Sequence, residues 1–130
     1  MMPKTVMIAD DDKDLLAVLE MRCRQLGLEV LTAEDGLTAL STADFALPHL
    51  VILDVSMPGG NGLAVCEMML DDDRLAKIPV IILTGRKDAE TRRRCQTMNA
   101  HYVCKGTDVW GQVEPLIERL LGLPHLAISC

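Results

Sequence analysis

Polar side chains that could do chemistry follow four short apolar runs of the chain. Asp10 and Asp11 come first, Asp54 follows a later run, and Thr84 and Lys105 end the last two. Neighbouring carboxylates repel each other by about 1 kcal/mol in water, and by more where water is scarce. They therefore need a cation. A small set of oxygen ligands suits Mg²⁺, whose coordination is commonly completed by water and a phosphate group. With an ammonium and a hydroxyl to hold anionic oxygens, this set predicts a site that stabilises a phosphoryl group.

Asp54 is the acid best placed to receive that group, because it stands alone at the end of its run. Asp10 and Asp11 are adjacent and better suited to hold the metal, while Lys105 can supply a positive charge and Thr84 a hydroxyl. The expected product is an acyl phosphate on Asp54. The alternative is that Asp54 only starts a turn, which is a common role for aspartate.

The elements that must position these residues can be predicted from the apolar pattern. The runs at 50–53 and 80–83 are aliphatic without alternation, which is typical of strands covered on both faces of a parallel sheet. The run at 29–33 alternates and suits a strand nearer the sheet edge. Strands are predicted at 5–9, 29–33, 50–53, 80–83 and 102–104, and helices at 15–26, 38–43, 63–70 and 88–98, with a last helix that ends at 121.

Two details of the helices are also predicted. Leu15, Leu19, Cys23 and Leu26 recur at helical spacing, and Gly27 is placed as a C-terminal cap. Pro115 is awkward inside the last helix, because proline lacks the N–H of a helical hydrogen bond. We favour a helix that begins near 111 or 112, with Pro115 in its first turn, over a helix kinked at Pro115.

The alternation of about five strands with about five helices predicts an α/β fold with a doubly wound parallel sheet and helices on both faces, since parallel strands need crossover connections. In such sheets the ligand lies beyond the carboxyl ends of the strands. The chemical residues named above are all expected at that edge.

Composition narrows the class of protein. The 130 residues fit one domain, and with 49% hydrophobic but 2% aromatic residues the core must be aliphatic. The net charge of −6 argues against binding nucleic acid. The apolar runs are too short for a membrane span or a signal peptide, so we expect a soluble, cytoplasmic protein that does not bind membranes. Five widely spaced cysteines without a C-x-x-C pair indicate neither a disulfide framework nor a zinc site.

Four motifs carry a resemblance to a known family: residues 8–12 (IADDD), 53–58 (LDVSMP), 83–85 (LTG) and 102–105 (YVCK). In their order, spacing and place at strand ends, the chain resembles the receiver domain of response regulators, the chemotaxis-regulator-like phosphoprotein module of two-component systems and phosphorelays. The resemblance covers residues 4–122. It implies a receiver domain at 1–122, a C-terminal tail or linker start at 123–130, and the flavodoxin-like strand order 2-1-3-4-5.

The resemblance also implies roles for individual residues. Asp54 corresponds to the phosphorylated aspartate and Asp11 to a direct Mg²⁺ ligand, with Asp10 assisting through water. The backbone carbonyl of Ser56 would complete the metal site.

The remaining roles concern the response to phosphorylation. Thr84 corresponds to the hydroxyl residue that follows the phosphoryl group, Lys105 to the lysine that pairs with it, and Tyr102 to the switch aromatic. The donor would be a sensor histidine kinase or a histidine phosphotransfer protein, and the output a downstream effector. Such a module is a switch and not an enzyme, because it catalyses only its own phosphorylation and dephosphorylation.

Two positions depart from the family pattern. Gly106 follows Lys105 where receivers commonly have proline, often through a cis bond, and glycine frees the backbone that proline would lock. Asn61 replaces the acid usually found before the glycine of the loop after Asp54. The first departure bears on the rigidity of the loop and the rate of switching, and the second is expected to matter little.

A concentration of positive charge suggests where the output surface lies. Residues 86–105 contain six of the 13 basic residues of the chain but only two acidic residues, Asp88 and Glu90. We expect the fourth helix, last strand and last helix to bind an acidic surface on a partner or on a second copy. The alternative is an ordinary solvated helix face. The six are Arg86, Lys87, Arg92, Arg93, Arg94 and Lys105.

Other classes of protein fit less well. A Mg²⁺-dependent phosphatase of the haloacid dehalogenase type also uses aspartate, Ser/Thr and lysine, but its nucleophile lies on the first strand and it needs a later acidic pair and a cap domain. A pseudo-receiver that only binds a partner tends to lose a member of the site. A calcium loop starting at Asp10 fails because its sixth position is Leu15 and not glycine. A flavin-binding flavodoxin would need Ser, Thr or Gly in the acidic turn after the first strand.

Overall fold

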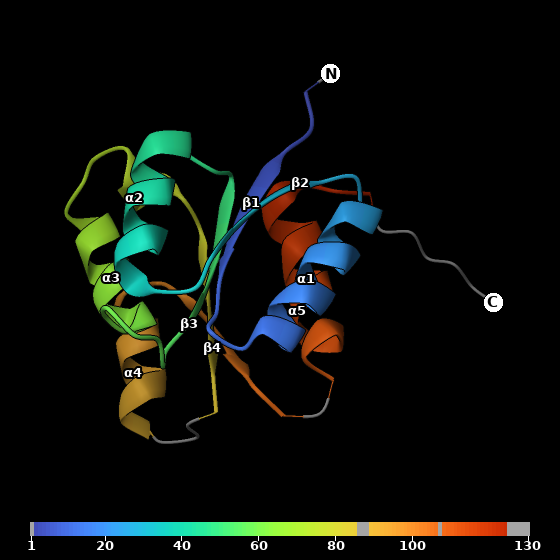
Figure 1. Cartoon of the computed structure of the whole chain (residues 1–130). Coiled ribbons are helices and arrows are strands. Elements are labelled where there is room, and N and C mark those ends of the chain that lie inside the picture. Colours follow the sequence, from blue (N-terminus) through green and yellow to red (C-terminus); the bar gives the residue numbers. More distant parts are fainter. Residues whose placement is uncertain (1, 86–88, 107, 125–130) are drawn as a thin grey trace.

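The computed structural model describes residues 2–85, 89–106 and 108–124. Its centre is one sheet of five parallel strands in the order β2-β1-β3-β4-β5 (Figure 1). This confirms the predicted doubly wound sheet and its 2-1-3-4-5 order. The strands are β1 (Thr5–Ala9), β2 (Glu29–Ala33), β3 (Leu50–Asp54), β4 (Val80–Thr84) and β5 (His101–Cys104).

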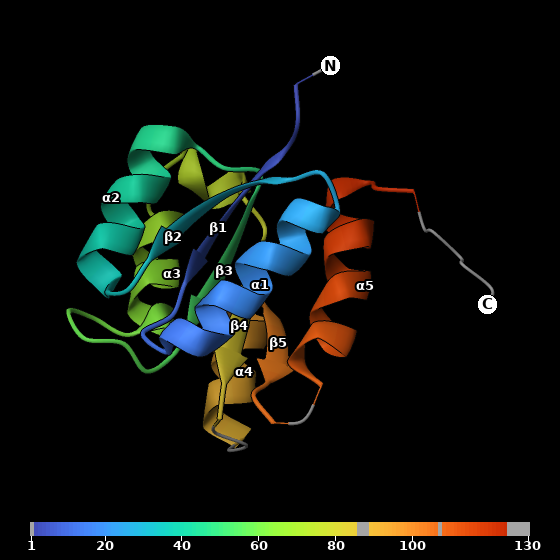
Figure 2. The ribbon, with the colours of Figure 1, turned by 45° about the vertical axis from the view of Figure 1, so that its right-hand side comes forward.

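Helices cover both faces of the sheet, as parallel strands joined by crossovers require. Figures 1 and 2 show α1 and α5 together on one face and α2, α3 and α4 on the other. A short 3₁₀ helix, η1, precedes β4. The helices are α1 (Lys13–Gln25), α2 (Gly36–Ala46), α3 (Gly62–Leu70), η1 (Leu75–Lys77), α4 (Ala89–Thr97) and α5 (Val109–Leu121).

The two central strands carry no alternation because both of their faces are covered. Every residue of β3 and β4 is buried. Successive side chains point to opposite faces, so Ile52 packs with α1 and α5 while Leu53 packs with the other three helices. The edge strand β2 keeps Glu29 and Thr32 exposed, which explains its alternating sequence.

The favoured late start of α5 is wrong. The helix begins at Val109, and Pro115 lies inside it. Asp108 caps the helix by accepting a hydrogen bond from the backbone N–H of Gly111 at 3.0 Å. Burial of the side chains of Val113, Ile117 and Leu121 stabilises the helix by more than it loses through the one hydrogen bond that proline cannot make.

Two smaller predictions also need correction. The second helix is longer than 38–43, because Asp35 caps its start and Leu47 ends it in the left-handed conformation. In α1 the buried face includes Leu16 in place of Leu15, which is only half-buried. Gly27 does follow the end of α1 with a positive φ of 84°, as its predicted cap role requires.

Some predictions fall on residues outside the described ranges. The predicted start of the fourth helix at Asp88, and the basic residues Arg86 and Lys87, belong to this group. Across the residues that are described, the helices are too short or too polar to cross a membrane.

Candidate functional site

The parallel register of the sheet brings the polar residues that follow its strands to one edge. Ala9 of β1 pairs with Leu53 of β3, so Asp10 and Asp54 lie side by side just beyond that pair. Asp54 in turn pairs with Leu83, which places Thr84 one residue further along β4. Sequence alone places each residue at a strand end, and the register makes them neighbours.

Three carboxylates meet at this edge. Asp10, Asp11 and Asp54 each offer an oxygen, and these oxygens all lie within 4.8 Å of one another. Asp10 is fully buried and Asp54 is 2% exposed, whereas Asp11 is exposed to solvent. Two buried acids this close repel each other strongly unless a cation lies between them.

Lys105, from the end of β5, supplies that positive charge. Its Nζ lies 2.9 Å from Asp10 Oδ2 and 3.2 Å from Asp54 Oδ2, and it donates a hydrogen bond to Asp10 Oδ1 at 3.2 Å. The lysine side chain is 23% exposed, so the ammonium reaches inward from the rim of the site. The backbone N–H of Lys105 donates to the carbonyl of Thr84 at 2.7 Å, which ties the ends of β4 and β5 together.

The pKa of Asp54 reflects this surrounding. Its pKa is raised from 3.8 to about 6: burial is the largest cause and the charge of Asp10 adds to it, while Lys105 and the backbone N–H of Ser56 act in the opposite direction. For Lys105, burial by itself would lower the pKa, but the hydrogen bond and charge of Asp10, together with Asp54, raise it above its ordinary value. Lys105 therefore stays protonated at neutral pH.

A dependence of stability on pH follows from the raised pKa of Asp54. The folded chain holds a proton there between about pH 4 and 6, where the unfolded chain has lost it, so this group favours folding as the pH falls through 6 toward 4. At pH 7 and without divalent metal, Asp54→Asn should be more stable than wild type, because one of the clustered charges is gone. The difference should shrink below pH 6. Urea unfolding of both proteins in EDTA from pH 5 to 7 measures it, and a less stable variant at pH 7 would contradict it.

Two residues that sequence reasoning did not single out shape the site. Asp12 caps α1 by accepting from the backbone N–H groups of Asp14 and Leu15, and its own N–H donates to Asp10 Oδ1 at 2.9 Å. Gly62 lies against the carbonyl group of Asp54, where an added methyl group would overlap the backbone. An aspartate three residues before Leu15 could have indicated the cap, whereas nothing local in the sequence indicates the contact of Gly62.

The remaining predicted residues have these places. Thr84 is buried at the end of β4. Ser56, exposed in the loop after β3, presents its backbone N–H to Asp54. Tyr102 pairs in register with Ile82 and is half-buried, with the Arg92 guanidinium 5.0 Å from its ring centre. Gly106 is exposed with open space around it.

The carboxylate cluster fits a hard divalent cation. All donors are oxygens, which suits Mg²⁺ better than a softer metal. Asp10 Oδ2 is buried and pairs with Lys105, yet within the described residues it accepts no hydrogen bond of good geometry. A buried carboxylate oxygen left in this state has capacity for a further positive partner. In contrast, residues 71–73 form no such cluster, and Asp72 accepts from the N–H groups of Arg74 and Leu75 instead.

Comparison with known proteins places the chain in a family. The family model described as the response regulator receiver domain matches residues 6–108. The response regulator PleD of Caulobacter vibrioides (strain NA1000 / CB15N) is 39% identical over 90 residues, which covers 67% of this chain and 20% of PleD. The chain spans 36% and 33% of the lengths of two further curated relatives.

Solved structures show the same fold. The non-phosphorylated receiver domain of HemR from Leptospira biflexa matches with a TM-score of 0.82 at 25% identity, covering 93% of this chain and 96% of that one. The receiver domain of the sensor histidine kinase PA1611 from Pseudomonas aeruginosa PAO1, solved with magnesium in its active-site cleft, matches with a TM-score of 0.82 at 20% identity, covering 93% and 99%. With its family match over residues 6–108 and the strand order described above, this chain belongs to the response regulator receiver domain family of two-component signalling.

Proposed function

We propose that the chain is a phospho-acceptor switch, which takes a phosphoryl group onto Asp54 from a histidine kinase or a histidine phosphotransfer protein in a Mg²⁺-dependent reaction. The observation that carries this proposal is the buried Asp54 carboxylate, held 3.2 Å from the Lys105 ammonium beside two further acids. A nucleophile, a positive charge and a metal-type ligand set occur together here, as phosphoryl transfer to a carboxylate requires.

In the proposed reaction, a carboxylate oxygen of Asp54 forms a bond to phosphorus as the bond from phosphorus to the donor atom breaks. Lys105 then pairs with an oxygen of the transferred group, and the Thr84 hydroxyl donates to another. The side chain of Asp54 is only 3% exposed, so a donor must be small or must present one projecting side chain. Phosphohistidine meets the second condition.

The residues that would hold Mg²⁺ are Asp10, Asp11, Asp54 and the backbone carbonyl of Ser56. When bound, the metal supplies positive charge that offsets the charge of the incoming phosphoryl oxygens. Asp10 and Lys105 keep the ligand set in place, because the ammonium balances two carboxylates that would otherwise repel each other.

The proposal extends to the limits of the module. Residues 1–122 form the receiver, and residues 123–130 are a tail or the start of a linker. The chain would act on itself alone, by catalysing its own phosphorylation and dephosphorylation. The magnesium seen in the PA1611 receiver supports the metal requirement by analogy of fold.

Acetyl phosphate provides the direct test of this function. Incubated with acetyl phosphate and Mg²⁺, the protein should gain the mass of one phosphoryl group, and in EDTA it should gain none. Intact-mass spectrometry measures both conditions. No gain of mass with either acetyl phosphate or a phosphorylated histidine phosphotransfer protein would refute the proposal.

We further propose that the signal leaves through α4, β5 and α5. Arg92 and Arg93 are exposed on α4, and Arg92 lies over the ring of Tyr102 on β5. A movement of Thr84 toward the phosphoryl group would reach this surface through Tyr102 and α4. The partner would be an acidic surface of an effector or of a second copy.

Charge reversal on α4 tests this output surface. Arg92→Glu with Arg93→Glu should weaken phosphorylation-dependent self-association or effector binding about tenfold or more, since like charges would then face each other. High salt should weaken the wild-type contact as well. Sedimentation and effector pull-down give the readout, with labelling of Asp54 as the control. Binding that persists while Asp54 is labelled normally would assign the output to another surface.

A further inference from the structure

Exposed apolar side chains gather on one part of the surface away from the acidic site. In the described part of the chain, eight large hydrophobic residues are at least 43% exposed. Five of them lie on α2, at its C-cap, or on α3. Phe45, the single phenylalanine of the chain, is 92% exposed. Such a concentration marks an interaction surface more often than chance exposure does. The five are Leu37, Phe45, Leu47, Met68 and Leu70.

Two of these residues, Leu37 and Met68, line a shallow groove between α2 and η1, next to the end of α3. The groove has a volume of about 320 Å³. Figures 1 and 2 both show α2 and α3 side by side on the same face of the sheet. Leu37, Ser41 and Phe45 follow each other at intervals of four, so they form one stripe along α2. The groove is lined by Leu37, Leu40, Ser41, Asp44, Met68, Asp72 and Leu75.

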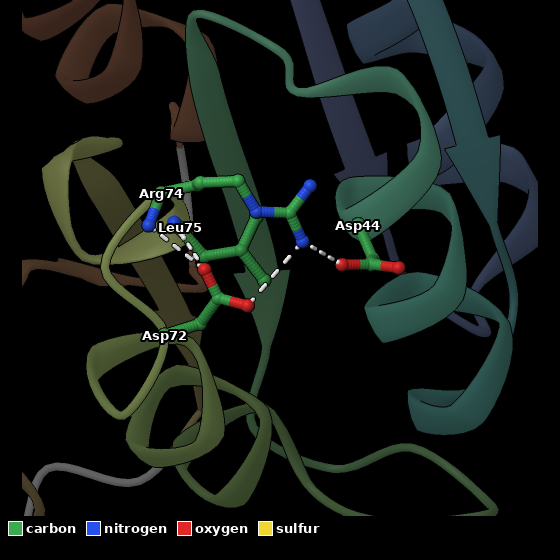
Figure 3. Close-up of polar contacts among 4 residues, drawn as sticks. All are labelled: Asp44, Asp72, Arg74 and Leu75. Atoms are coloured by element: carbon green, nitrogen blue, oxygen red, sulfur yellow. Dashed lines mark hydrogen bonds and ion pairs between the residues drawn. The ribbon is translucent and has the colours of Figure 1, made fainter.

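An ion-pair network holds the groove open at one end. Arg74 pairs with Asp44 of α2 at 2.5 Å and with Asp72 at 3.4 Å, as Figure 3 shows. Asp72 also accepts from the backbone N–H groups of Arg74 and Leu75. Leu75 is 3% exposed and forms part of the wall. These contacts connect α2 with the segment before β4 across one end of the groove.

The charge around the groove is negative. Asp71 and Asp73 are exposed beside Asp72, and Asp44 stands on the opposite side. Arg74, which lies among these four carboxylates, is already held by Asp44 and Asp72, and the next base along the chain, Lys77, is exposed on η1. An occupant of the groove would therefore be attracted by positive charge at its edges and by apolar side chains at its centre.

This charge pattern argues against a second copy as the occupant. Two copies joined symmetrically through this surface would bring their carboxylates together, which is unfavourable. The basic helix α4 does not fit either, because apart from the small Ala89 its exposed residues are polar or charged and offer no large apolar anchor. What fits is a helix with apolar residues on one face and Lys or Arg beside them.

We propose that the groove between α2 and η1 binds a basic amphipathic helix of a partner protein. Leu37 and Met68 in the groove, with Phe45 further along the stripe on α2, contact its apolar face, and the exposed Asp71 and Asp73 pair with its basic residues. This binding uses none of the proposed phosphorylation residues, so it should be the same in Asp54→Asn. The tests of phosphorylation and of groove binding are therefore independent, and a negative result in one does not bear on the other.

A synthetic helical peptide tests the proposal. One peptide carries leucine at positions i, i+3, i+4 and i+7 with flanking lysines, and a matched peptide carries glutamate in place of lysine. Fluorescence anisotropy measures affinity, and backbone NMR shifts locate the contact. The lysine peptide should bind and should shift resonances of α2 and residues 68–75. Leu37→Asn with Met68→Gln should weaken it about tenfold or more, since exposed side chains of this size anchor peptide helices.

Matched variants separate the contributions. Val18→Asn with Met21→Gln removes comparable exposed apolar residues from α1 and should leave binding unchanged. Asp71→Asn with Asp73→Asn should weaken binding and reduce its salt dependence. Equal binding of the two peptides, shifts on another surface, or full binding by the Leu37→Asn/Met68→Gln protein would overturn the proposal. A dimer that this variant abolishes would show that a second copy occupies the groove instead.

Discussion

Asp54→Asn is expected to abolish the transfer of a phosphoryl group from acetyl phosphate to the protein. An amide has no negative oxygen to attack phosphorus, and its product would not be an acyl phosphate. The neighbouring Asp10 and Asp11 remain, but Asp10 pairs with Lys105 through both oxygens and Asp11 is exposed. Intact mass after incubation with Mg²⁺ and acetyl phosphate should show one added group in wild type and none in the variant.

The control for this experiment is Asp44→Asn, which removes an exposed acid of α2 that lies outside the cluster of Asp10, Asp11 and Asp54. It should label like wild type, because Asp44 pairs only with Arg74 in the described structure. Equal labelling of Asp54→Asn and wild type would show that Asp54 is not the nucleophile. If peptide mapping then located the group on Asp10, the phosphatase-like alternative, whose nucleophile lies on the first strand, would be favoured.

Removal of the Lys105 ammonium should have the largest effect on stability. Lys105→Met keeps the length of the side chain but leaves Asp10 and Asp54 buried together without their shared cation. Breaking a buried ion pair by removing one partner costs about 3–5 kcal/mol, and because Lys105 is partly exposed we expect a loss at the lower end, about 3 kcal/mol. Urea unfolding at pH 7 in EDTA measures it.

Two comparisons show whether the loss comes from the buried charges. Adding Asp54→Asn to Lys105→Met should recover much of the stability, because one of the two opposed carboxylates is gone. Lys13→Met is the matched control, because Lys13 pairs with Glu34 at 3.9 Å on the exposed surface. It should change the free energy of unfolding by less than about 1 kcal/mol. Equal stability of Lys105→Met and wild type would contradict the charge arrangement described here.

The same variant should also slow phosphorylation. If Mg²⁺ binds as proposed, adding it to Lys105→Met should restore part of its stability, because the metal would bind the folded carboxylates in preference to the unfolded ones. The phosphoryl oxygens would still lack their ammonium partner. A stable but slowly labelled protein in Mg²⁺ would separate the structural role of Lys105 from its role in transfer.

Much of the fold could be predicted from the order of residue types. Unbroken aliphatic runs such as those of β3 and β4 identify strands covered on both sides, because only such strands lack a polar face. The placing of Asp10, Asp54, Thr84 and Lys105 after these runs predicts one shared edge, since all parallel strands end on the same side. The family motifs then predicted the strand order, which the sheet confirms.

Other features depended on contacts and burial that the pattern of residue types does not show. The start of α5 could not be judged from Pro115 alone, because the side-chain cap of Asp108 and the burial of Val113 and Ile117 outweigh one lost hydrogen bond. Neither the close approach of Gly62 to Asp54 nor the groove beside Arg74 leaves a local signal, as each joins segments that meet only after folding.

The sequence by itself therefore determined which residues carry charge, hydroxyl groups and apolar surface, and at which end of which strand they stand. Only the tertiary structure decided how deeply Asp54 is buried and how far it lies from Asp10 and Lys105. Those quantities raise the pKa of Asp54 to about 6 and leave Lys105 charged. The physical reason is that desolvation and Coulomb energy depend on the distances and burial of all neighbours together, which the packing of β1, β3 and β5 sets.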